Sequence, residues 1–326
     1  MRYTKIGRTD INASVVALGT WAMAGDSNWG SSDDKESIEV IHRAIDLGIN
    51  LIDTAPAYGF GHSEEVLGQA LAGKRDKVFV STKCGLRWDA DSGYVQMERD
   101  GVVLRRVLTP DSIRLEVERS LKNLKTDYID IYITHWQTMS GFDPAIAVTM
   151  QTLLELKKAG KIRGIGIANV TADQIKEYAA QGQLDLVQNK YSMLDRDAQK
   201  DILQLCADKG VTFQPYSPLE RGILAGKITA DTQVTGRARA ANKWYLPENR
   251  AKVLAMLDKM RPLCGKYQCS LSALVVAWTA AQSPNINVLC GSRHLAQIQE
   301  NADGGNVPLD PADIRAMDNC LNTVLA

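Results

Sequence analysis

Eight short apolar stretches, each followed by a stretch with helical periodicity, constrain the fold of this 326-residue chain more than any other feature. The strand-like stretches span residues 15–18, 49–53, 78–83, 128–134, 162–167, 185–190, 211–216 and 286–290. The helical patterns cover residues 34–47, 63–71, 110–124, 145–159, 171–180, 198–209, 248–267 with 270–281, and 295–302. Strands that are apolar on both faces and joined by helices belong to parallel sheets. The pattern predicts an α/β fold, a closed (β/α)8 TIM barrel, with a doubly wound open sheet as the alternative because strand order cannot be read from sequence.

Two segments lie outside the eight units. Residues 2–14 are interpreted as a hairpin around Gly7 to Asp10 that plugs the bottom of the barrel, and residues 309–321 as a C-terminal surface helix. An α/β barrel accommodates a chain of this length, so we expect residues 1–326 to form a single domain.

Two predicted loops, residues 84–109 and 217–247, are much longer than the usual connections in α/β units. Each follows the C-terminal end of a strand, which in a barrel is the face that carries the active site. We therefore expect both loops to act as lids or binding walls.

Composition narrows the possible partners. The 38 basic residues balance 38 acidic ones, so charge gives no reason to expect nucleic acid or an anionic membrane as a partner. The polar start and the lack of an 18-residue apolar run predict a cytoplasmic protein without a membrane span. Six scattered cysteines and four histidines lack the spacing of metal ligands, which predicts free thiols and no metal site. A small-molecule partner is the remaining expectation.

Four residues with acid–base chemistry lie at the ends of three successive predicted strands. Asp53 ends the second strand and Tyr58 lies in the loop after it, Lys83 ends the third strand, and His135 directly follows the fourth. In a parallel barrel these positions meet at one rim. A single Asp or Lys at a strand end is usually a solvated group, but four such residues at corresponding positions favour a site.

These four side chains suit proton delivery to a carbonyl oxygen. The ordinary pKa of tyrosine is about 10, and an adjacent Lys83 ammonium is expected to lower the pKa of Tyr58. Asp53 would keep Lys83 charged, Tyr58 would be the general acid, and His135 would donate a hydrogen bond that orients the substrate oxygen. The pattern contains no nucleophile and no second carboxylate paired with Asp53, so the electrons must come from a bound hydride donor.

The same residues occur in motifs that resemble the aldo-keto reductases. The motifs are GTWAMAG, NLIDTAPAYGFGHSEEVLGQAL, STKCG, DYIDIYITHW, GKIRGIGIAN, VQNKYSML and YSPLERGILAGK, in this order along nearly the whole chain. The chain is most similar to the bacterial branch that includes a methylglyoxal reductase, and more distantly resembles the β-subunits of potassium channels. The resemblance implies an extended nicotinamide cofactor bound without a Rossmann domain, and reduction of small aldehydes or ketones to alcohols by hydride from nicotinamide C4. A catalytically weak, cofactor-sensing regulatory subunit is the alternative.

The resemblance also implies the contacts of the cofactor. The nicotinamide carboxamide would be held by the amides of Asn169 and Gln188, and the nicotinamide ring would stack on Tyr216. The pyrophosphate would lie along the next turn, at Ser217, Leu219 and Gly222. The family usually has Ser where this chain has Ala168, which implies one lost hydrogen bond to the carboxamide. Arg237 and Arg239 either close over the cofactor or are solubilising surface charges.

In the family, the stretch 291–301 meets the adenosine end of the cofactor. Ser292 and Arg293 would recognise a 2′-phosphate, since a guanidinium matches phosphate geometry, while Gln297 and Asn301 would meet ribose and adenine. Many relatives have Arg in place of Gln297. We therefore expect a preference for NADPH, with NADH possible.

Tryptophans indicate the character of the substrate pocket. Trp21 follows the first strand and Trp136 is next to His135, which predicts apolar walls around a polar catalytic end; Trp29 and Trp88 in neighbouring loops are expected to be packing residues. The sequence identifies neither the physiological substrate nor the oligomeric state.

Overall fold

Eight parallel strands close into a barrel in the computed structural model, which describes residues 1–137, 139, 141–142 and 144–325. The strands pair in chain order, and the last pairs with the first through the register Val288↔Val16. They are β3 (Val16–Gly19), β4 (Leu51–Asp53), β5 (Phe79–Cys84), β9 (Ile129–Thr134), β10 (Ile162–Ala168), β11 (Leu186–Lys190), β12 (Thr212–Tyr216) and β13 (Val288–Gly291). The predicted (β/α)8 barrel is confirmed, and the open sheet is wrong.

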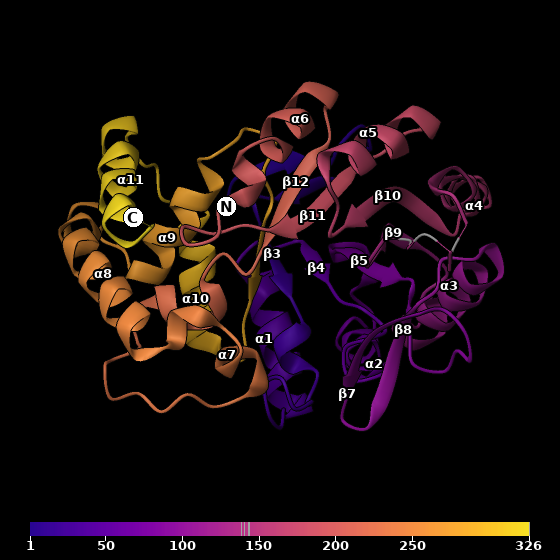
Figure 1. Cartoon of the computed structure of the whole chain (residues 1–326), viewed down its shortest axis with the longest axis horizontal. Helices are drawn as coiled ribbons and strands as arrows, with labels where there is room; N and C mark the ends of the chain where they lie inside the picture. Colours follow the sequence, from indigo (N-terminus) through magenta and orange to yellow (C-terminus); the bar gives the residue numbers. More distant parts are fainter. Residues whose placement is uncertain (138, 140, 143, 326) are drawn as a thin grey trace.

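Helices surround the barrel (Figure 1), and several begin where the sequence supplies a cap. Asp33 accepts the backbone N–H groups of Lys35 and Glu36 at the start of the first helix, and Thr171 forms a capping box with Gln174. The predicted helix 198–209 is divided into a short turn, η3 (Asp197–Gln199), and α6 (Ile202–Lys209). The helices are α1 (Asp34–Asp46), α2 (His62–Ala70), α3 (Pro110–Leu124), α4 (Ile146–Lys158), α5 (Ala172–Gln181), α6 (Ile202–Lys209), α8 (Pro247–Tyr267), α9 (Leu271–Ala280), α10 (Leu295–Gly304) and α11 (Pro311–Leu325).

The N-terminal hairpin closes one end of the barrel, as predicted. Its strands β1 (Tyr3–Lys5) and β2 (Asn12–Ser14) pair antiparallel, and Ile6 and Ile11 are fully buried in a cluster with barrel residues. Gly7 has φ of +52°, and a Cβ there would lie 2.5 Å from the Asp185 carbonyl oxygen, so only glycine fits this turn. The opposite end of the barrel is thereby the accessible one.

The long segment after β5 is more regular than expected. It forms a three-stranded antiparallel sheet of β6 (Leu86–Arg87), β8 (Val102–Arg106) and β7 (Tyr94–Arg99). Asp100 and Gly101 both have positive φ, which is the backbone of a two-residue hairpin turn. The prediction of an irregular loop is wrong here, because the Asp–Gly pair between alternating side chains is a hairpin signal.

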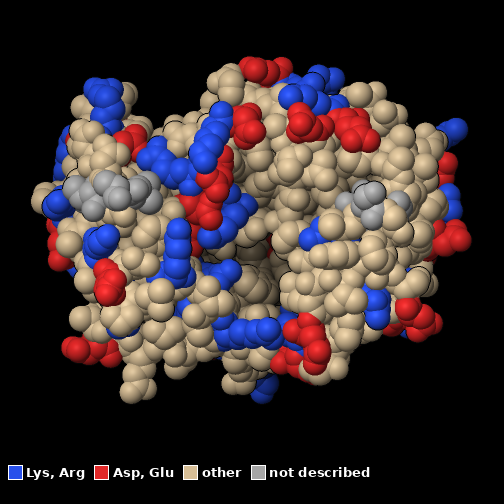
Figure 2. Space-filling model, viewed as in Figure 1, with Lys and Arg blue, Asp and Glu red and all other residues tan. Residues whose placement is uncertain are grey.

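The second long segment crosses over the loop after β3. It contains η4 (Glu220–Ala225), α7 (Arg237–Ala240) and η5 (Lys243–Tyr245), and α7 begins with hydrogen bonds to the carbonyl groups of Ser27 and Asn28. Figure 1 shows α7 and the β7–β8 hairpin at the same lower edge of the view, and Figure 2 shows a hollow in the middle of this face with Lys and Arg side chains along its left margin. Within the described residues, no helix is both long enough and apolar enough to span a membrane.

Candidate active site

A buried ion pair lies at the C-terminal end of β4 and β5. Lys83 Nζ donates to Asp53 Oδ1 at 2.6 Å and to the Thr54 carbonyl oxygen at 2.8 Å. Both charged side chains are only 1% exposed. Asp53 Oδ2 accepts a further hydrogen bond from Ser81 Oγ at 2.9 Å. The carboxylate therefore fixes the ammonium and compensates its charge in a place that water does not reach.

Tyr58 completes the group from the loop after β4. Its hydroxyl lies 3.3 Å from Lys83 Nζ, and its ring meets the His135 ring edge-on with the centroids 5.9 Å apart. His135 follows β9, and its backbone N–H donates to the Cys84 carbonyl oxygen at 2.8 Å. The structure thus brings together all four residues that the sequence predicts at this rim.

Burial sets the protonation states of this group. Burial raises the pKa of Tyr58 above its ordinary value, and the attraction of Lys83 for the phenolate lowers that pKa without cancelling the rise. Burial acts to lower the pKa of Lys83, but the charges of Asp53 and Tyr58 outweigh it and leave that pKa raised. Burial, Lys83 and Arg99 hold the pKa of His135 well below its usual range. At neutral pH the site therefore holds a phenol, an ammonium and a neutral imidazole, and the expected net lowering of the Tyr58 pKa is wrong.

The residues predicted for the nicotinamide carboxamide surround the same point. Asn169 has φ of +56°, a conformation that asparagine tolerates. Its side chain donates to the His135 carbonyl oxygen and accepts from the Tyr216 hydroxyl, both at 2.8 Å. Gln188 Nε2 donates to Asp53 Oδ2 at 3.1 Å. At Ala168 only the backbone offers a polar group, and Gln137 Nε2 donates to its carbonyl oxygen at 2.8 Å.

The turn after β12 has an unusual backbone. Ser217, Glu220 and Arg221 have positive φ although none is glycine, and they are followed by Gly222 at +103°. Such a run costs free energy and is found mainly where a loop serves a ligand. It includes the stretch predicted to line a pyrophosphate, in which Leu219 is half-buried.

The residues predicted to meet adenosine lie where β13 leads into α10. Ser292 and Asn301 are buried and joined by a hydrogen bond of 2.9 Å, and Asn301 Oδ1 has no partner among the described residues. Arg293 instead donates to the carbonyl oxygens of Trp29 and Ser31, and Gln297 Oε1 accepts the Arg293 backbone N–H at 2.8 Å.

The two arginines of α7 contact protein groups. Arg237 donates to the Glu98 carbonyl oxygen at 3.4 Å, whereas Arg239 Nε donates to the Arg221 carbonyl oxygen at 3.1 Å and its guanidinium lies over the Trp29 ring. Both therefore tie the second long segment to its neighbours.

Aromatic rings border Tyr58, among them Trp21, one of the two residues predicted for the substrate pocket. The Trp21 ring lies 6.3 Å from the Tyr58 ring and 5.3 Å from Trp29. Trp136 packs against a small apolar cluster that includes Leu104, under the guanidinium of Arg106. The β7–β8 hairpin thus contributes to the wall beside His135.

Sequence reasoning missed Arg99, which reaches the site from the β7–β8 hairpin. It donates to the Ala57 carbonyl oxygen next to Tyr58, pairs with Asp26 at 3.4 Å and lies over the Phe60 ring. It is buried, so it stabilises the loop that carries Tyr58. The Asp–Gly hairpin signal was the only indication that this segment is ordered.

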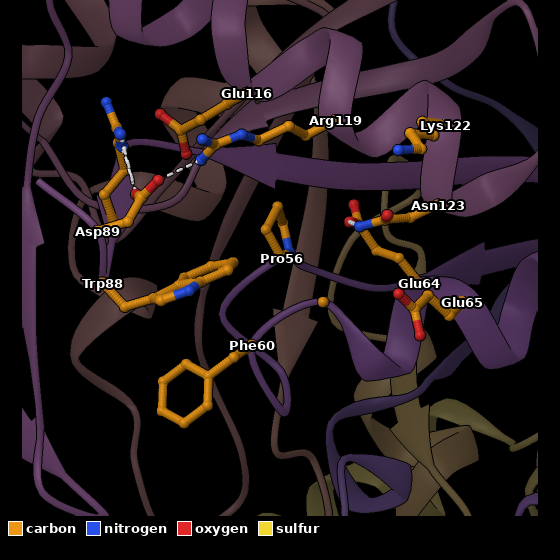
Figure 3. Close-up of a pocket in the computed structure, with 12 residues that line it drawn as sticks. Pro56, Phe60, Glu64, Glu65, Trp88, Asp89, Glu116, Arg119, Lys122 and Asn123 are labelled. Atoms are coloured by element: carbon orange, nitrogen blue, oxygen red, sulfur yellow. Dashed lines mark hydrogen bonds and ion pairs between the residues drawn. The ribbon is translucent and has the colours of Figure 1, made fainter.

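A pocket of about 360 Å³ lies behind the Tyr58 loop, between α2 and α3. Figure 3 shows Trp88 and Phe60 side by side at one side of it and Arg119 reaching Asp89. Glu116 is buried there and accepts the Gly85 N–H with both carboxylate oxygens. Burial raises the pKa of Glu116 to about 8. None of the four predicted catalytic residues lines this pocket, so we interpret it as support for the loops after β4 and β5.

Comparison with known proteins agrees with this geometry. The model of the Aldo/keto reductase family matches residues 15–322. The chain belongs to the aldo/keto reductase family. It is 46% identical over 319 residues to an NADH-specific methylglyoxal reductase of Escherichia coli K12, covering 97% of each chain, and 35% identical to an aldo-keto reductase of Bacillus subtilis 168, covering 100% of this chain and 95% of the relative. The solved structure of a glycerol dehydrogenase from Gluconobacter oxydans superposes with a TM-score of 0.89 at 35% identity, covering 99% of this chain and 96% of that one.

As an oxidoreductase of this family, the protein acts on carbonyl groups with a nicotinamide coenzyme. The described residues contain no group of three side chains able to hold a metal ion.

Proposed function

We propose that this aldo-keto reductase reduces small aldehydes or ketones to alcohols, with Tyr58 as the general acid. The observation that carries the proposal is the position of Lys83 Nζ, which lies within hydrogen-bonding distance of both Asp53 and the Tyr58 hydroxyl. This arrangement suits a reaction in which the phenol gives up its proton, because the ammonium stabilises the phenolate.

Each of the four residues has a role at the substrate oxygen. When bound, the coenzyme would supply a hydride from nicotinamide C4 to the carbonyl carbon. His135, neutral at physiological pH, donates a hydrogen bond that orients the carbonyl oxygen, and Tyr58 transfers its proton to that oxygen. Lys83 stabilises the phenolate that remains, and Asp53 holds Lys83 in its charged form and in place. Solvent afterwards returns the proton to Tyr58.

For the substrate, we propose a small carbonyl compound held between Trp21 and Trp136, such as methylglyoxal. The proposal is supported by the relative named as a methylglyoxal reductase and by the aromatic rings around Tyr58. We also propose that residues 1–326 act as one domain, because β13 must pair with β3 to close the barrel. A cytoplasmic location is proposed from the sequence alone.

The preference for NADPH remains a prediction, and it requires the Arg293 side chain to change its partners. To bind a 2′-phosphate, its guanidinium must leave the carbonyl oxygens of Trp29 and Ser31, whereas NADH requires no such exchange. The relative at 46% identity is named as NADH-specific. The ratio of kcat/KM for NADPH to kcat/KM for NADH decides which coenzyme the protein prefers. If Arg293 binds the phosphate, Arg293→Ala lowers kcat/KM for NADPH at least tenfold more than for NADH.

The function is tested by following coenzyme absorbance with methylglyoxal and with an aromatic aldehyde. We expect turnover by the wild type and a loss of at least about a hundredfold in Tyr58→Phe. Tyr128→Phe, which removes a phenol at the other end of the barrel, is the matched control and keeps its activity. Tight coenzyme binding without turnover of any aldehyde by the wild type would favour the regulatory-subunit alternative.

A further inference from the structure

A chain of buried amides crosses the barrel interior and ends at the catalytic carboxylate. Gln188 and Gln214 face each other across β11 and β12, and Gln188 Nε2 donates to Gln214 Oε1 at 2.6 Å. Gln214 Nε2 donates to Asn287 Oδ1 at 2.6 Å, and Asn287 Nδ2 donates to the Ser14 carbonyl oxygen at 2.6 Å. All three amides are at least 97% buried. The other hydrogen of Gln188 Nε2 goes to Asp53 Oδ2.

The two ends of this chain fix the orientation of every amide in it. A carboxylate and a backbone carbonyl only accept hydrogen bonds, so Gln188 must present nitrogen to Asp53, and Asn287 must present nitrogen to Ser14. Gln214 must then present oxygen to Gln188 and nitrogen to Asn287, because any flip would set two donors or two acceptors against each other. One arrangement satisfies all the bonds.

This arrangement leaves one group of Gln188 for a ligand. Both hydrogens of its Nε2 are used within the protein, toward Asp53 and toward Gln214. Its Oε1 accepts no hydrogen bond from the residues that the structure describes. Gln188 can therefore accept a hydrogen bond from a bound coenzyme but has no hydrogen left to give to it.

We propose that Gln214 and Asn287 are positioning residues for the coenzyme, which hold Gln188 so that its Oε1 accepts from the –NH2 group of the nicotinamide carboxamide. The inference rests on the proposed function, because it requires the coenzyme to bind at the C-terminal end of the barrel. It goes beyond that function in assigning a role to two buried amides that do not touch the coenzyme. With Ala168 in place of a serine, the carboxamide has one fewer protein partner, so its recognition depends more on Gln188.

The test compares two coenzymes that differ at this group. In acetylpyridine adenine dinucleotide a methyl group replaces the carboxamide –NH2, which removes the donor that Gln188 is expected to recognise. Dissociation constants for it and for NAD+ are measured by quenching of tryptophan fluorescence, without turnover. We expect the wild type to prefer NAD+ by about tenfold, the worth of a buried hydrogen bond, and Gln188→Leu to lose the preference. Gln214→Met should reduce it to about twofold, because Gln188 then loses its anchor.

The control is Gln282→Met, which removes a partly buried amide that donates to the Trp278 carbonyl oxygen outside this chain of bonds. It should keep the wild-type preference for NAD+. Thermal unfolding of each variant without coenzyme shows whether it is folded, and Asn287→Leu gives the same readout should Gln214→Met not fold. An unchanged preference in a folded Gln214→Met or Asn287→Leu would overturn the inference. Failure of the wild type to bind both NAD(H) and NADP(H) would instead overturn the proposed function.

Discussion

Replacing Lys83 with Met tests two roles of this side chain, which are to compensate the buried charge of Asp53 and to stabilise the phenolate of Tyr58. The substitution keeps the volume of the side chain but removes the charge that lies 2.6 Å from Asp53 and 3.3 Å from the Tyr58 hydroxyl. Among the described residues, the buried Asp53 carboxylate would then keep Ser81 and Gln188 as its side-chain donors. Leaving one partner of a buried ion pair alone costs about 3 to 5 kcal/mol, and we expect this loss in the free energy of unfolding.

The effect on catalysis follows from the other contact of Lys83. Two unit charges 3.3 Å apart attract by about 5 kcal/mol at an effective dielectric constant of about 20. The phenolate of Tyr58 loses this attraction in the variant, so its formation during the reaction becomes harder. We expect kcat for carbonyl reduction to fall at least about a hundredfold.

The assay combines urea unfolding with steady-state kinetics in Lys83→Met and in the double variant Asp53→Asn/Lys83→Met. The double variant removes both charges, so it should recover most of the lost stability but none of the activity. The reasoning is refuted if Lys83→Met unfolds within about 1 kcal/mol of the wild type, or if the double variant is as unstable as the single one. Retention of kcat in Lys83→Met would refute the catalytic part.

Three further predictions concern protonation and the hairpin. Burial raises the pKa of Glu116 from 4.5 to about 8, so the stability that this group contributes is full below about pH 4.5 and is lost as the pH rises to about 8. The loss in the free energy of unfolding has a ceiling of about 5 kcal/mol at pH 8. Glu116→Gln still accepts the Gly85 N–H and should remove this pH-dependent loss, which urea unfolding measures. The pKa of Tyr58 is raised and that of His135 is lowered, so kcat for carbonyl reduction should stay level between about pH 6 and 9. Alcohol oxidation needs the phenolate of Tyr58, so its kcat should increase with pH. A fall in kcat for reduction across this range contradicts the assignment of Tyr58 as the acid. Arg99→Met leaves Asp26 buried without its cation and should lower the free energy of unfolding by about 3 kcal/mol. An additional change of Asp26 to Asn should restore most of this stability. Equal stability of the wild type and Arg99→Met would contradict a stabilising buried ion pair between Arg99 and Asp26.

The sequence predicts the barrel well because burial on both faces leaves a direct trace in the chain. Most strands of the barrel are largely apolar, with polar interruptions such as Gln188 and Gln214, and several helices begin at a capping residue such as Asp33 or Thr171. The segment 84–109 was predicted less well, because its strands are half-exposed and polar, so only the turn at Asp100 and Gly101 carries a signal. Local propensity is weak evidence where little apolar surface is buried.

The four catalytic candidates were found from sequence because parallel strands bring their C-terminal ends to one rim. That rule requires no knowledge of side-chain contacts, so Asp53, Lys83 and His135 could be assigned to one place from their positions alone. The rule does not give the charge balance of the site. Whether Lys83 or burial controls the pKa of Tyr58 depends on how much water the surrounding loops exclude, which the chain order does not contain.

The sequence by itself determined the eight strand–helix units, the rim that carries the chemistry and the family to which the chain belongs. Only the tertiary structure decided how buried polar groups far apart in the sequence pair with one another. Gln188 and Gln214 lie on neighbouring strands, but Asp53 reaches Gln188 across the barrel, and Arg99 reaches the Tyr58 loop from a separate sheet. Such pairs leave no periodic trace, because each is one contact made possible by closure of the barrel and selected by the cost of leaving a buried polar group without a partner.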